Sequence, residues 1–109
     1  MADYTVGLMN GKWDDTVHIL HMYSVTARCD CINAVQKPMM DRDLGFLVGR
    51  DPFAVDAAAA RLLAEACEAE GREVAETLLT AAERAAAYVA ETYGIAAEAP
   101  IERIHLRPA

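Results

Sequence analysis

The chain has 109 residues, of which 54% are hydrophobic and 25% charged, a composition typical of one globular domain with a modest core. Its net charge of -7 argues against nucleic acid or an anionic membrane as the main partner, because phosphate binding requires a cationic face. No apolar run reaches the length of a membrane span, and the three cysteines form no spaced disulfide framework. We therefore expect a cytoplasmic protein that forms a single domain over residues 1–109.

The first segment, residues 2–13, permits two interpretations. Apolar side chains alternate from Tyr4 to Leu8, and Asn10-Gly11 is a strong hairpin signal, which together indicate a strand. The same residues are equally consistent with a helix that ends at Asn10-Gly11 in a left-handed cap. Periodicity alone leaves both interpretations open.

The next segment, Thr16–Thr26, is rich in β-branched and aromatic residues and is apolar on both faces. This pattern predicts a strand that is covered on both sides. His18 and His21 differ in parity along the strand and therefore face opposite ways. A packing or interface role is the favoured interpretation for each histidine, ahead of metal ligation.

The sequence Cys29-Asp30-Cys31 lies in the most irregular part of the chain. In an extended backbone residues i and i+2 project to the same side, so both thiolates could reach one metal ion or cluster iron. Because a C-x-C pair supplies only two ligands, the others would have to come from Asp30, His18, His21, Cys67 or another chain. The alternative is that the two cysteines are small apolar packing residues.

Leu44–Gly49 is a short apolar run between turn residues and predicts a buried central strand. Asp51 and Pro52 then form a typical helix start, with the carboxylate as cap and proline in the first turn. This helix should run to about Glu70 and end at Gly71. Its expected apolar stripe is Val55, Ala59, Leu62, Leu63 and Ala66, with Cys67 packed beside it.

A second helix is expected from about Arg72 to Tyr93, with Gly94 as its stop. The many alanines in both helices indicate close helix–helix or helix–sheet approach. The tail, Ile101 to Leu106, alternates weakly and could add an edge strand.

Three charged residues are candidates for ligand binding. Asp51 and Asp56 lie at the start of the first long helix, where strand-to-helix loops often place binding groups. If the cysteine loop lies at the same sheet edge, Lys37 could complete one pocket with them as an anchor for an anion or carboxylate. The alternative is that both aspartates only stabilise the helix start.

The spacing of four motifs adds a family resemblance. Cys29-Asp30-Cys31, Lys37-Pro38, Asp43-Leu44-Gly45 and Asp51-Pro52-Phe53-Ala54-Val55-Asp56 follow one another in this order. Together they resemble the C-terminal half of the uncharacterised iron–sulfur-associated domain-of-unknown-function three-six-two family. The resemblance extends over nearly the whole chain and implies a helix end for the first segment.

The chain also departs from that family's pattern. Family members are usually much longer, so the chain looks like a split subunit, a truncated relative or a fragment. Many members carry an insertion with two C-x-x-C-x-x-C runs, which this sequence lacks. The iron–sulfur association of the family therefore need not involve Cys29 and Cys31.

We expect an α/β fold, a small mixed sheet of two to three strands flanked by two alanine-rich helices and completed by oligomerisation or a partner chain. The leading functional hypothesis is a redox accessory protein that holds a metal ion or iron–sulfur cluster through Cys29, Asp30 and Cys31. The second is a non-enzymatic interaction or assembly subunit with structural cysteines. The third is a carboxylate-binding enzyme that uses Asp30, Lys37 and Asp56 in acid–base chemistry.

Overall fold

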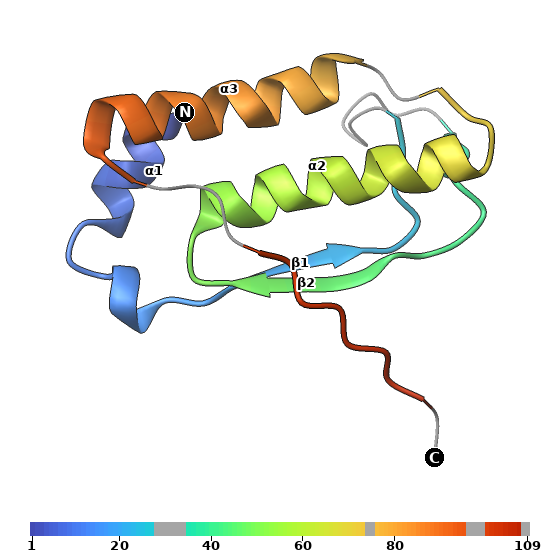
Figure 1. Cartoon of the computed structure of the whole chain (residues 1–109), viewed down its shortest axis with the longest axis horizontal. Coiled ribbons are helices and arrows are strands. Elements are labelled where there is room, and N and C mark those ends of the chain that lie inside the picture. The colour runs from blue at the N-terminus through green and yellow to red at the C-terminus, as the bar shows by residue number, and fades with distance from the viewer. Residues whose placement is uncertain (28–34, 74–75, 96–99, 108–109) are drawn as a thin grey trace.

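The computed structural model describes residues 1–27, 35–73, 76–95 and 100–107. Within these ranges the chain forms a small α/β fold, which confirms the predicted class. Figure 1 shows the layers: the sheet, then helix α2 across it, then α3 on α2, with α1 at one end. The elements are α1 (Ala2–Met9), the 3-10 helix η1 (Trp13–Asp15), β1 (His18–Met22), β2 (Gly45–Gly49), α2 (Pro52–Ala69) and α3 (Glu76–Tyr93).

The sheet of the described residues has two antiparallel strands, with Leu20 paired to Leu47 on one face and Ile19 paired to Val48 on the other. Helix α2 packs on the face that carries Leu20 and Leu47. We call this the inner face. The opposite, outer face is exposed, so the expectation that both strands are buried on two sides is wrong for the isolated chain.

β1 ends earlier than the sequence pattern predicted, because the chain turns at Ser24. This residue has a φ of 48°, and its backbone N–H donates to Oδ1 of Asp43 at 2.8 Å. Partial pairing continues beyond the turn through an isolated antiparallel bridge between Thr26 and Pro38. The two flanks of the intervening segment are therefore held together.

Helix α2 begins and ends as predicted. Oδ1 of Asp51 accepts hydrogen bonds from the N–H groups of Phe53 and Ala54, at 2.8 and 3.2 Å, and so satisfies two free donors of the first turn. Gly71, with a φ of 67°, terminates the helix in the left-handed conformation. The main core cluster comprises Met22, Met40, Ala59, Leu63, Ala66 and Cys67, and the burial of Cys67 confirms its expected packing role.

The first segment is the helix α1, followed by Gly11 with a φ of 73°, and this excludes the hairpin interpretation. α1 packs against α3, where Val6 and Trp13 lie on a second cluster formed by Phe53 and Val89. In the described part of the chain, no helix combines the length and apolar character needed to cross a membrane.

The tail differs from its prediction. Residues 101–107 form no strand, although Arg103 is held against α2 by an ion pair with Glu65 at 3.1 Å. Ile104 and Leu106 are 74% and 91% exposed. The expected edge strand is therefore unformed in the isolated chain.

Candidate functional site

In the sequence, the predicted metal loop falls between β1 and β2. Cys29, Asp30 and Cys31 are outside the described residues, so their geometry stays a prediction. The flanks of the loop are ordered by a hydrogen bond from the N–H of Met39 to the carbonyl of Val25 at 2.7 Å. Within the described ranges, no group of three His, Cys, Asp or Glu side chains is arranged to hold a metal ion.

The three predicted ligand-binding residues do not all line one cavity. Asp51 caps α2, which is the structural role considered as its alternative. Lys37 is exposed and takes no part in the cavity that Asp56 lines. Of the three, Asp56 is the residue that the fold places at a cavity.

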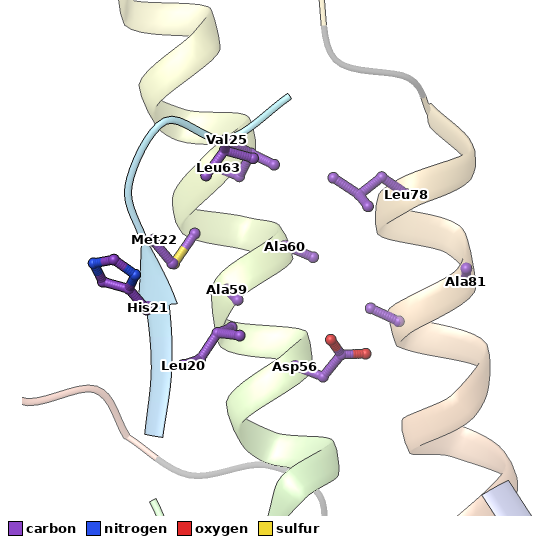
Figure 2. Close-up of a pocket in the computed structure, with 11 residues that line it drawn as sticks. Leu20, His21, Met22, Val25, Asp56, Ala59, Ala60, Leu63, Leu78 and Ala81 are labelled. Carbon is purple, nitrogen blue, oxygen red and sulfur yellow. The ribbon is translucent and has the colours of Figure 1, made fainter. Parts of the chain in front are cut away.

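That cavity lies between β1, α2 and α3 and has a volume of about 350 Å³. In Figure 2, Leu20 and Met22 border it from β1, while Leu78 and Ala81 border it from α3. The α2 wall consists of Ala59, Ala60 and Leu63, with Asp56 one turn nearer the start of the helix. The lining is thus apolar apart from Asp56 and His21, and Figure 2 shows the His21 ring turned away from the other lining side chains.

Alanines keep this space open. Ala60 on α2 and Ala81 and Ala82 on α3 line the cavity with side chains of one carbon. α2 and α3 pack on each other, and larger residues at these positions would fill the volume. The alanine-rich sequence predicted close helix packing, but the cavity could not be anticipated from it.

A second candidate surface is the outer face of the sheet. Ile19, Phe46 and Val48 are 67%, 63% and 65% exposed there. His21 stacks on the rings of Tyr23 and Phe46, with centroid separations of 4.2 and 4.9 Å. These five residues form one apolar and aromatic surface, which we call the outer patch.

The opposite parity expected for the two histidines of β1 is confirmed. His21 belongs to the outer patch, whereas His18 lies on the inner face opposite Gly49. Nε2 of His18 is buried, and no described group forms a hydrogen bond with it. The two rings cannot ligate one ion together.

An exposed polar cluster joins α1 to the C-terminal part of α3. Oδ1 of Asp3 in α1 accepts hydrogen bonds from the hydroxyl groups of Tyr88, at 2.7 Å, and of Tyr93 in α3. Because both bonds favour the carboxylate, they lower the pKa of Asp3 below its ordinary value. The hydrogen bond to Asp3 raises the pKa of Tyr93 to about 12 and also raises that of Tyr88.

Sequence reasoning missed the outer patch because it treated the apolar run at 44–49 as a buried central strand. The signal was present in the alternation of Phe46 and Val48 with the two glycines and Leu47. A short apolar strand has the same pattern whether its second face is covered by the same chain or left bare.

Comparisons with family models, with curated proteins and with solved structures find no match to this chain. The family resemblance drawn from the motifs therefore stays a prediction.

Proposed function

We propose that this protein is an assembly subunit that associates with a second copy of itself through the outer patch. The observation that supports this most directly is the contiguous exposure of Ile19, Phe46 and Val48 on a sheet of two strands. Burying one such side chain fully contributes about 1.5–3 kcal/mol, part of which is lost to the entropy of association. Apolar patches of this kind on small proteins typically mark interaction sites.

The tail supports a second copy as the partner. Ile104 and Leu106 are a second exposed apolar pair on the same chain, and their i, i+2 spacing matches one face of a strand. Figure 1 shows this segment extending beyond the sheet. Each described strand pairs on one side only, so an added strand would find free backbone groups at the sheet edge.

The charge of the tail adds little to this argument, because Arg103 and Arg107 exceed Glu102 by one and Arg103 already pairs with Glu65 of the same chain. We also propose a cytoplasmic location, which is supported by an odd number of cysteines without a spaced disulfide framework.

Light scattering combined with size-exclusion chromatography, over a range of protein concentrations, tests the proposal. We expect wild type to form dimers and Phe46→Ser to shift to monomers. Tyr4→Ser, which removes an exposed aromatic side chain from α1, is the matched control and should remain dimeric. A wild-type protein that stays monomeric at every concentration would exclude the proposal.

We infer a second function from the ordered flanks of the cysteine loop. The bridge between Thr26 and Pro38 and the bond between Val25 and Met39 close the segment that carries Cys29 and Cys31. Because the two ends of this segment are fixed, we propose that its two thiolates bind one metal ion. Two copies would supply four cysteines, the ligand number of structural zinc and of iron–sulfur clusters.

Metal analysis and an absorption spectrum of protein purified without oxygen test this second function. Iron or zinc should copurify with wild type and be lost in the Cys29→Ser/Cys31→Ser variant. Cys67→Ala, which removes the buried thiol of α2, should retain the metal. If the wild type contains no metal and the double variant has the same absorption spectrum, the metal function is excluded and the assembly function is the one that remains.

A further inference from the structure

The cavity between β1, α2 and α3 lies on the opposite side of the sheet from the outer patch. Its volume of about 350 Å³ falls at the lower end of the range of small-molecule sites, about 300–1,000 Å³. Its lining has the usual composition of such sites, apolar with few polar groups, here Asp56 and His21. An inference drawn from it does not rest on the proposed assembly.

Asp56 occupies a position at which the helical pattern predicts an apolar residue. Asp56, Ala59, Ala60 and Leu63 follow the i, i+3, i+4, i+7 spacing of one helical face, and all four line the cavity. Figure 2 shows the carboxylate of Asp56 extending from α2 toward α3. A charged residue at the end of an apolar stripe departs from the local pattern, and such departures concentrate at functional sites.

The structural role that the sequence offered for Asp56 is filled by another residue. Asp51 already accepts from the first free N–H groups of α2. No ion pair joins Asp56 to any residue in the described ranges, since the pairs formed there are those of Arg72 and Arg103 with other carboxylates. Its carboxylate is available to a ligand.

We propose that this cavity binds a small organic cation, a primary amine with an alkyl or aryl group. The ammonium group pairs with Asp56 at the rim, and the apolar group lies between Leu20 and Met22 of β1 and Leu78 of α3. An organic anion of the same length is opposed by Asp56 and by the net charge of -7. A neutral ligand of the same length forms no ion pair with Asp56 and therefore binds less tightly.

The size of the cavity limits the ligand. With about 30 Å³ for each water-sized group, the volume accommodates on the order of ten non-hydrogen atoms. Octylamine has a suitable length, and 1-octanol and octanoate match it in chain length while differing in charge.

Calorimetric titration of the wild-type protein with these three probes tests the proposal. We expect octylamine to bind at least about tenfold more tightly than 1-octanol, and octanoate to bind more weakly than both. Asp56→Asn should lower octylamine affinity about tenfold and leave 1-octanol affinity unchanged. Glu83→Gln, which removes one exposed charge from α3 away from the cavity, is the matched control and should bind like wild type.

Ala81→Leu separates binding in the cavity from binding elsewhere. Ala81 is an exposed lining residue of α3, so leucine can enter the volume without disturbing the buried core, and it should abolish binding of octylamine and 1-octanol alike. Equal affinity for the three probes would overturn the proposed ligand class, as would an Asp56→Asn protein with unchanged amine affinity. Binding that survives Ala81→Leu, or no binding to folded wild type, would overturn the site.

Discussion

The two faces of the sheet carry similar residues but have different surroundings. On the inner face, Leu20 and Met22 lie beneath α2 and contribute to the core around Leu63. On the outer face, Ile19 and Val48 come from the same two strands and are more than half exposed. The two faces therefore have similar compositions, and they differ because α2 covers the inner face alone.

This difference separates stability from association. Apolar surface that is already buried contributes to the free energy of unfolding of the single chain. Apolar surface that is exposed contributes instead to the free energy of association, when a partner covers it. Substitutions on the inner face should therefore change the free energy of unfolding, whereas substitutions on the outer face should change the oligomeric state.

The largest effect is expected from Leu63→Ala on α2. This side chain is 5% exposed and packs in the core with Met22 and Met40, so the variant should lose about 2–5 kcal/mol of unfolding free energy. Urea denaturation at low protein concentration measures the loss. Val48→Ala on the outer face should change it by only about 0.5 kcal/mol. Equal losses would remove the distinction between the faces.

A smaller effect is expected at Gly49, where Val55 of α2 approaches the inner face. A Cβ added to Gly49 would lie 2.6 Å from Cγ2 of Val55, so Gly49→Ala should destabilise the chain by about 1–3 kcal/mol. Val55→Ala in the same chain should restore part of this loss.

Gly7 is the matched control for Gly49. It lies within α1 and has no atom within 4 Å of an added Cβ, so Gly7→Ala should stabilise by about 0.5–1 kcal/mol. Thermal unfolding of the two alanine variants checks the opposite signs. A neutral Gly49→Ala would contradict the close approach of α2, and a destabilised Gly7→Ala would contradict the open surroundings of Gly7.

Loss of the cap that fixes the start of α2 should have an effect of about 1 kcal/mol. Asp51→Ala removes the acceptor for the N–H groups of Phe53 and Ala54, whereas Asp51→Asn keeps an oxygen there. Circular dichroism during denaturation should show a clear loss for alanine and a small one for asparagine. Similar losses in both variants would indicate that the charge of Asp51 matters more than its cap geometry.

The smallest effect is expected at the exposed cluster of Asp3, Tyr88 and Tyr93, which touches neither face of the sheet. The pKa of Asp3 is lowered in the folded protein. Its contribution to stability is therefore present above about pH 3.8 and is lost as the pH falls through the native pKa. Because the pKa of Tyr93 is raised to about 12, that contribution is present below 10.0 and is lost as pH rises toward 12.

Ultraviolet titration of tyrosinate measures this cluster when the signal of Tyr93 is isolated from the other three tyrosines by comparison with Tyr93→Phe. Asp3→Asn should move the ionisation of Tyr93 from about 12 back toward 10.0, and Asp14→Asn, an exposed aspartate of η1, should leave it unchanged. A Tyr93 titration that is the same in wild type and Asp3→Asn would show that the hydrogen bond does not form in solution.

Much of the local structure could be predicted from the sequence because its causes are local. Asp51 and Pro52 specify a helix start, Gly71 a helix end, and the spacing of Val55, Ala59 and Leu63 a buried helical face. The early end of β1 could not be predicted, because it depends on Asp43, nineteen residues away, accepting from Ser24.

The candidate site was predicted only in part. Asp56 was identified by its place near a helix start, but its role as a capping residue and its role as a cavity residue were not separated. That separation required the position of α3, whose alanines face the same space. Lys37 was joined to Asp56 by the assumption that two loops share one sheet edge, and the fold keeps Lys37 out of the cavity.

By itself, the sequence determined the class of fold, the bounds of α2 and the alternation of side chains along both strands, since these follow from backbone geometry and nearest neighbours. Only the tertiary structure decided which strand face is covered, where a cavity remains and which aspartate lines it. Those properties depend on how α2 and α3 lie over the sheet, and helix position is fixed by the fit of distant surfaces that periodicity along the chain does not encode.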